Sequence, residues 1–175
     1  LIVEKNTQPF GLTRLAHALI SEALINIAKQ HSTEKGLNIC YLIEEAETLA
    51  KSHTEYFDLA CCMELLEHVP DPTSLIKACA NLVKPNGWVF FSTINRNPYA
   101  YLTAIIGAEY FLKLLPKGTH HYERFIRPSE LASASRKVGL GLRKLQGIHY
   151  NPLTRSAVLT NTVSINYIAA FQKQI

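Results

Sequence analysis

The sequence predicts an α/β protein with a doubly wound, mostly parallel sheet and an antiparallel hairpin at its C-terminal edge. Short apolar runs alternate with helical patterns through the middle of the chain, and the final third contains two strand-like segments separated by a loop. The length of 175 residues suits one domain, 1–175, with a real core. Apolar residues make up 47% and charged residues 18%, as in ordinary globular proteins.

The first half supplies strands and helices in turn. Ser21 can cap a helix that continues to His31, and Asn38–Ile43 follows as a short buried strand. EEAETLAKSH is then a short helix or loop. YFDLACCM, Tyr56–Met63, is nearly all apolar, which is typical of a parallel strand covered on both faces.

A strand–helix–strand unit follows. Asp71 is a helix cap, and Pro72 takes the first helical position, where its missing N–H costs nothing. Lys84–Gly87 breaks the helix, and WVFFST, Trp88–Thr93, is the next buried strand. This rhythm predicts a right-handed βαβ unit.

The C-terminal third contains two helix candidates and two strand candidates. Pro98–Leu115 is a long apolar helix, and Pro128–Val138 is a second helix. Leu142–Tyr150 and Val163–Phe171 are strands, and the second of them alternates along one face. Together they predict the antiparallel edge.

Charge and cysteine content limit the function and the compartment. The net charge is +4 and the positive residues are scattered, which argues against a dedicated nucleic-acid binder. One loose basic group would suit an anionic membrane surface: Lys113, Lys117, Arg124 and Arg127. Four cysteines in apolar runs, without a C-x-x-C pair, predict buried free thiols: Cys40, Cys61, Cys62 and Cys79. With no recognisable signal peptide or spanning segment, we expect a cytoplasmic protein or one peripheral to the inner face of a membrane.

MELLEHVPDP, Met63–Pro72, brings two carboxylates and an imidazole to the end of a predicted strand, where ligands of doubly wound sheets bind. On one helical turn, Glu64, Glu67 and His68 would project from the same side. They could bind a divalent cation such as Mg²⁺ or supply a general base. A solvated surface turn explains the same spacing, and the residues alone leave these interpretations open.

LEHVPDP after an apolar strand, followed by a helix and KPNGWVFFST, resembles the class I S-adenosylmethionine-dependent methyltransferases, which have a Rossmann-like fold. Four further motifs, in order, resemble the ubiquinone-biosynthesis O-methyltransferases: STINRN, IIGAEYFLKLLPKGTHHYERFIRPSEL, GIHYNP and SINYIAAF. The resemblance runs from about Ser21 to the C-terminus.

The resemblance implies O-methylation, by S-adenosylmethionine, of a catechol-type hydroxyl on a polyprenylated ubiquinone precursor. The family's eukaryotic members match this chain at Glu64, Glu67 and His68, which implies Mg²⁺ binding there, with His68 as the base if no metal binds. Met63 matches a position that contacts S-adenosylmethionine, and Ala46 matches the loop that meets the adenine.

The polyprenylated phenol or quinol substrate lies in the bilayer, so the apolar and basic segment 98–127 is predicted to contact the membrane or capture the tail. A lid or a dimer contact is the alternative. Other ubiquinone-biosynthesis proteins are expected partners. His149 could line the substrate pocket or form a turn, and a ligand pair at His120 and His121 is disfavoured because adjacent side chains usually point apart.

One departure from the family is large. Such enzymes begin with a strand and a glycine-rich loop that binds the cofactor, whereas this chain has only Gly11 before Ser21. Leu15–His17 resembles the end of the first helix. Either the segment has been deleted, or the sequence represents part of a longer protein. We favour the second, because a sheet without its central first strand would have unpaired edges.

Two rival functions follow: another class I methyltransferase, such as one that methylates a quinone carbon, and a non-catalytic methyltransferase-like module without its cofactor loop.

Overall fold

The computed structural model describes residues 2–6, 13–18, 22–102, 121–151, 154 and 156–175. Within these residues, one sheet has eight strands in the order β3-β2-β1-β4-β5-β8-β6-β7. The strands are β1 Ile2–Asn6, β2 Thr13–Ala18, β3 Ile39–Leu42, β4 Phe57–Met63, β5 Val83–Ile94, β6 Leu140–Asn151, β7 Ser156–Thr160 and β8 Asn166–Lys173. The helices are α1 Glu22–Glu34, α2 Ala46–Ser52, α3 Pro72–Leu82, α4 Pro98–Ala100 and α5 Pro128–Lys137, with a 3-10 turn at Tyr122–Arg124.

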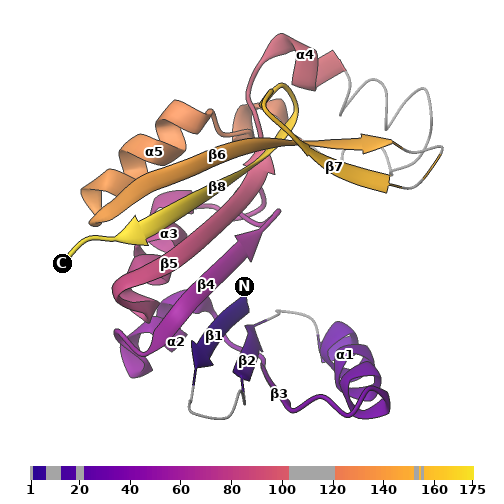
Figure 1. Ribbon diagram of the computed structural model, residues 1–175, viewed down its shortest axis with the longest axis vertical. Coiled ribbons are helices and arrows are strands. Elements are labelled where there is room, and N and C mark those ends of the chain that lie inside the picture. The colour runs from indigo at the N-terminus through magenta and orange to yellow at the C-terminus, as the bar shows by residue number, and fades with distance from the viewer. Residues whose placement is uncertain (1, 7–12, 19–21, 103–120, 152–153, 155) are drawn as a thin grey trace.

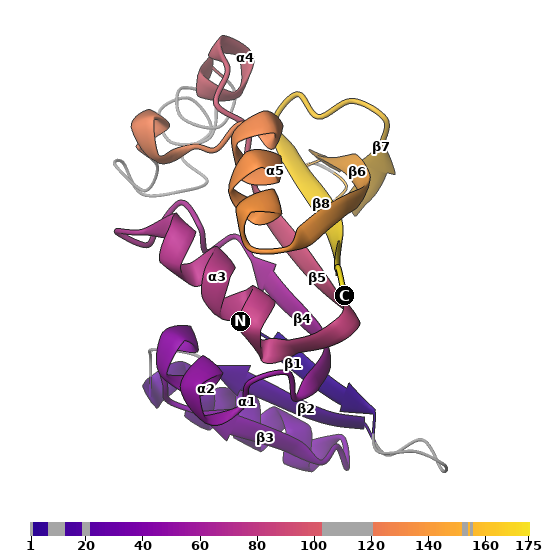
Figure 2. The same cartoon turned by 90° about the vertical axis from the view of Figure 1, so that its left-hand side faces the viewer.

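The core lies between the sheet and the helices of one face. Helices α2, α3 and α5 lie along this face (Figure 2), whereas α1 lies beside β3 (Figure 1). Phe91, Tyr167 and Phe171 of the sheet pack with Leu75 and Leu131 of the helices, and each is at most 3% exposed. Burial of these large side chains is the main term that stabilises the fold.

The predicted βαβ unit is confirmed. Strands β4 and β5 are parallel, and α3 connects them. The Asp71 carboxylate accepts hydrogen bonds from the backbone N–H groups of Thr73 and Ser74, at 2.9 and 3.2 Å, and Pro72 takes the first helical position. These bonds satisfy donors that have no partner within the helix.

Strand β5 begins five residues earlier than predicted, at Val83 instead of Trp88. Val83 pairs with Phe57 and Trp88 pairs with Leu59, so Lys84–Gly87 bulges out of the ladder. Asn86 has a φ of 64°, and a Cβ on Gly87 would lie 2.8 Å from the carbonyl oxygen of Lys84. The expected break is therefore a bulge within one strand, which only the pairing with β4 reveals.

The C-terminal antiparallel edge is confirmed, with one additional strand. Strand β8 pairs antiparallel with both β5 and β6, and the unpredicted β7 pairs with β6 at the edge. Four of the five β7 residues are exposed, so the strand lacks the apolar alternation that would predict it. Of the apolar segment at Pro98–Leu115, only its first residues, including α4, are described, so its predicted length stays untested.

The N-terminal region differs from the prediction. Leu15–His17 belongs to β2 rather than to the end of a helix, and β1 pairs antiparallel with both β2 and β4. The sheet is therefore continuous between β2 and β4, and its backbone groups there are paired. The physical argument from unpaired edges for a missing segment is thus wrong for this sheet.

The prediction that all four cysteines are buried is wrong for Cys40, which is exposed on the edge strand β3. Cys62 and Cys79 are buried, Cys61 is half-buried, and none of the four forms a disulfide. Among the described helices, none combines the length and apolar character needed to cross a bilayer.

Candidate active site

The end of β4 turns sharply into the predicted site. Glu64 has a φ of 45°, in the left-handed region that residues other than glycine rarely adopt. Its backbone N–H donates to the carbonyl oxygen and to the hydroxyl oxygen of Ser92 on β5, at 3.1 and 3.0 Å. The neighbouring parallel strand therefore holds this turn in place.

The Glu64 carboxylate accepts hydrogen bonds from residues of two strands. The Ser92 hydroxyl of β5 donates to Oε1 at 2.7 Å, and Nδ2 of Asn166, the first residue of β8, donates to Oε2 at 3.1 Å. Although much of the residue is exposed, these bonds restrict the orientation of its carboxylate. The site thus depends on β8, which is more than 100 residues away along the sequence.

Glu67 is the buried partner of Glu64 and is only 4% exposed. The hydroxyl of Thr93 on β5 donates to its Oε2 at 2.7 Å. On the strand next to Thr93, Tyr167 is fully buried and donates its hydroxyl to the carbonyl oxygen of Ile126 at 2.9 Å. The loop after β4 therefore places one carboxylate at the surface and the other inside the protein.

The two carboxyl groups are coupled electrostatically. Burial among the surrounding protein atoms raises the pKa of Glu64 and that of Glu67 above their usual value. Repulsion from Glu67 raises the pKa of Glu64 further, while the hydrogen bond from Ser92 opposes this increase. Each carboxyl group therefore holds a proton more readily than an exposed glutamate does, which suits a group that takes part in proton transfer.

His68 is separated from this environment. Its side chain is exposed, and its backbone N–H donates to the carbonyl oxygen of Leu65 at 3.0 Å in a tight turn. Within the described residues, no three His, Cys, Asp or Glu side chains are grouped to hold a metal ion. Ser92, Asn166 and Thr93 donate to the glutamate oxygens, and the metal assignment of Glu64, Glu67 and His68 gains no structural support, so it stays a prediction.

The two predicted cofactor contacts lie at the ends of neighbouring elements. Met63 is the last residue of β4 and is 42% exposed. Ala46 is the first residue of α2 and is 7% exposed. Their roles in binding S-adenosylmethionine stay predictions. Strand β1 runs antiparallel to β4, and no glycine-rich loop follows it in the sequence.

The remaining histidine predictions have mixed outcomes. His149 lies on β6 and lines a small cavity of about 230 Å³ together with Tyr99 and Thr160, so it does face a cavity. His121 is an exposed residue before the 3-10 turn, and His120 lies outside the described residues, so the disfavoured pair is untested.

Sequence reasoning assigned no role to four residues that build the site: Ser92, Thr93, Asn166 and Tyr167. They lie within STINRN and its preceding strand and within SINYIAAF, which carried the family resemblance. Hydroxyl residues at the carboxyl end of an apolar parallel strand were the available signal. The contribution of β8 had no local signal.

Comparison with known proteins supports the fold and identifies the family. A family described as "Methyltransferase domain" matches residues 15–145. The ubiquinone biosynthesis O-methyltransferase of Bordetella avium is 51% identical over 154 residues, which are 88% of this chain and 64% of the relative. The protein of the same name from Saccharophagus degradans is 53% identical over 155 residues, 88% of this chain and 66% of that protein.

The chain belongs to the ubiquinone-biosynthesis O-methyltransferase family. It spans slightly less than two thirds of the length of these relatives. Among solved structures, a Methanosarcina mazei S-adenosylmethionine-dependent methyltransferase has a TM-score of 0.66 at 18% identity, covering 93% of this chain and 82% of that one. A possible histamine N-methyltransferase from Thermotoga maritima has a TM-score of 0.63 at 19% identity, covering 91% and 72%. These likenesses confirm the class I methyltransferase fold for this member of the family.

Proposed function

We propose that this protein transfers a methyl group from S-adenosylmethionine to a catechol-type hydroxyl of a polyprenylated ubiquinone precursor. The observation that carries the proposal is the Glu64–Glu67 pair at the carboxyl ends of β4 and β5, in a chain of this family. A free phenol has a pKa of about 10 and is a poor nucleophile at neutral pH. A carboxylate pair that can take its proton meets that chemical need.

The chain's own residues would orient the hydroxyl and hold its proton. When bound, S-adenosylmethionine would supply the electrophilic methyl group: the S–CH3 bond would break as the O–CH3 bond forms, with S-adenosylhomocysteine as the leaving group. The ionised member of the glutamate pair accepts the phenolic proton, while Ser92 and Thr93 keep the two carboxyl groups in position. No step of this proposal uses Mg²⁺.

Membrane contact through 98–127 is part of the same proposal. At the start of this segment, three large side chains are exposed, Tyr99 at 57%, Tyr101 at 43% and Leu102 at 56%. Aromatic side chains are favoured at the interface of a bilayer, and exposed Arg124 lies near the other end of the segment. This would place the protein on a membrane surface that contains its substrate and the other enzymes of the pathway.

The first test is methyl transfer by Glu67→Gln and Glu67→Ala variants. With a tail-bearing catechol substrate, we expect kcat to fall by about 100-fold or more, because a proton acceptor is removed. The melting temperature of Glu67→Gln should stay close to that of the wild type, since the amide oxygen can still accept from Thr93. Glu34→Gln, on the exposed α1, is the matched control. A fully active Glu67→Ala enzyme would overturn the assignment.

A non-catalytic methyltransferase-like module is a second candidate, favoured by the antiparallel β1 and the lack of a glycine-rich loop. Calorimetric titration with S-adenosylhomocysteine, with and without Mg²⁺, separates the two candidates. Micromolar binding supports the enzyme, whereas no binding by the folded chain supports the module. Binding that requires Mg²⁺ would support the predicted metal assignment of Glu64, Glu67 and His68.

A further inference from the structure

A cleft of about 660 Å³ opens between α3, α5 and the segment 121–127, and we call it the α3–α5 cleft. Its volume lies within the range that small-molecule sites usually have. No residue predicted from the sequence as catalytic or cofactor-binding lines it. The kind of ligand that the cleft could bind is therefore a separate question.

Apolar side chains occur on both walls of the α3–α5 cleft, beside polar and charged ones. The loop after β4 and α3 supply Leu66, Val69 and Ile76, and the opposite wall is formed by Phe125 and Leu131, with Ala134 at its edge. Four of these side chains are almost fully buried, so their neighbours hold them in place: Leu66, Ile76, Phe125 and Leu131. The apolar part of this lining favours a hydrocarbon group, because contact removes apolar surface from water.

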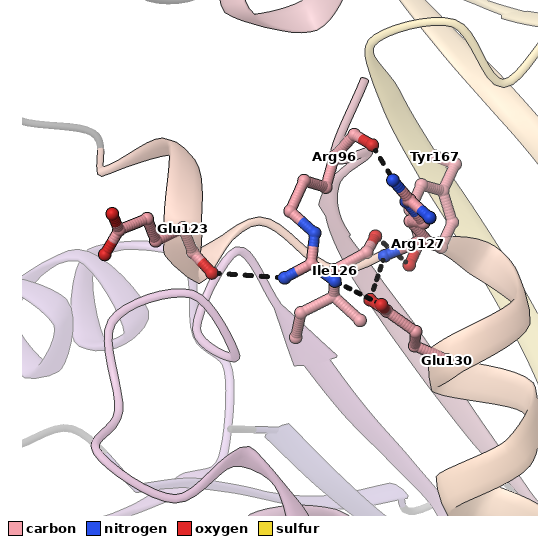
Figure 3. A network of polar contacts seen from close by, with 6 residues as sticks. All are labelled: Arg96, Glu123, Ile126, Arg127, Glu130 and Tyr167. Carbon is pink, nitrogen blue, oxygen red and sulfur yellow. Dashed lines mark hydrogen bonds and ion pairs between the residues drawn. The ribbon is translucent and has the colours of Figure 1, made fainter. Parts of the chain in front are cut away.

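The formal charges of the residues that line the α3–α5 cleft sum to zero. Two arginines, Arg96 and Arg124, are matched by two glutamates, Glu123 and Glu130. The Arg96 guanidinium forms an ion pair with Glu130 and donates to the carbonyl oxygen of Glu123 at 3.3 Å (Figure 3). The Arg127 backbone N–H also donates to Glu130, at 3.0 Å. A lining without net charge suits a neutral chain better than a fatty acid or a phosphate.

The α3–α5 cleft adjoins the candidate active site. Leu66 lines the cleft, and the next residue, Glu67, accepts a hydrogen bond from Thr93 of β5. The loop after β4 thus contributes both to the carboxylate pair and to the cleft lining.

We propose that the α3–α5 cleft binds the first units of a neutral isoprenoid chain, the tail of the acceptor substrate. This inference rests on the proposed function, since that function supplies a substrate with such a tail. In this proposal the catechol ring of the substrate binds at the carboxylate pair, and its isoprenoid tail binds in a separate subsite, the α3–α5 cleft. Loss of the subsite should therefore affect binding of the tail and leave the chemistry of the ring unchanged.

Steady-state kinetics of variants that fill the cleft provide the first test. Ala134→Trp and Thr73→Trp each add a large ring at the edge of the cleft, and Thr73 is exposed, so its variant should fold. For a farnesyl-bearing catechol we expect KM to rise roughly tenfold, which corresponds to about 1.4 kcal/mol. KM for the same catechol without a tail should not change. Val158→Trp, on exposed β7, is the control and should leave both KM values unchanged.

An equal change of KM for both substrates, or no change for either, would overturn the inference while leaving the proposed function intact. If the wild type methylates neither substrate, the proposed function fails and a binding measurement decides the subsite alone. In methyl-labelled protein, farnesol below its solubility limit should shift the Ile76 and Leu131 methyl resonances, and Thr73→Trp should weaken that shift. Absence of a shift, or shifts confined to other regions, would overturn the inference.

Discussion

Glu64 and Glu67 are three positions apart and have different surroundings. A backbone turn with positive φ exposes much of Glu64, while Glu67 returns to the interior and is held by Thr93. Tyr167 lies on the same buried side and donates to Ile126 instead of to either carboxylate. Each polar group near the pair therefore has a defined partner, which keeps the carboxyl groups oriented.

Tyr167 predicts a pH effect on stability. Burial, and to a smaller extent the negative charge of Glu67, raise the pKa of its phenol well above the ordinary value of 10.0. The neutral phenol therefore stabilises the fold fully below pH 10.0, and this contribution is lost as pH rises through the folded-state pKa. In urea unfolding between pH 8 and 11, we expect the wild type to lose more stability than Tyr167→Phe. Parallel curves for the two proteins would contradict the prediction.

At the level of elements, Gly147 lets the chain cross closely over β6. A Cβ at this position would lie 1.7 Å from the carbonyl oxygen of Thr162 and 2.7 Å from Oγ1 of Thr160. The first of these is a backbone atom and cannot rotate away. The glycine of GIHYNP is therefore needed where the loop after β7 returns toward β8, which carries Asn166 to the candidate site.

We predict that Gly147→Ala lowers the free energy of unfolding by about 2 kcal/mol, as overpacking of a closed site does. Gly141→Ala on the same strand is the matched control, because its nearest neighbour is the flexible end of the Gln174 side chain at 3.3 Å. Chemical denaturation of both variants measures the difference. If both variants lose the same free energy of unfolding, the close approach of Thr162 to Gly147 does not limit the side chain at position 147.

The whole sheet depends on the N-terminal hairpin for its continuity. Strand β1 lies between β2 and β4 in the sheet. Strands β2 and β3 therefore connect to the rest of the sheet through the five residues of β1. An antiparallel strand here satisfies the backbone groups of both neighbours as well as a parallel one would. Its direction, however, brings the start of β1, rather than a loop after it, to the carboxyl end of β4.

Val3→Pro tests this role, because proline removes a backbone donor and is poorly tolerated inside a sheet. We expect faster amide exchange in β1, in β2 and at Leu59–Cys61 of β4, with β5, β8 and β6 still protected. Val3→Thr, which keeps the N–H, is the control. If exchange in β2 is unchanged by proline, β1 does not hold the two parts of the sheet together.

Several elements are decided by local chemistry and were predictable. Asp71 and Pro72 begin α3 because one accepts from free N–H groups and the other needs no partner. The apolar runs of β4 and β5 predict buried parallel strands, and Glu64 and Glu67 follow directly from the end of β4. The bulge at Lys84–Gly87 and the exposed β7 have no such local pattern, so they were missed.

By itself, the sequence determined the class of fold, the family and the position of the carboxylate pair, because capping, apolar runs and motif order are properties of neighbouring residues. The tertiary structure alone decided that His68 is exposed while Glu67 is buried, that Asn166 of β8 completes the site, and that β1 enters the sheet in the opposite direction. These outcomes depend on pairing and burial between segments far apart in the chain, and no periodicity within one segment records them.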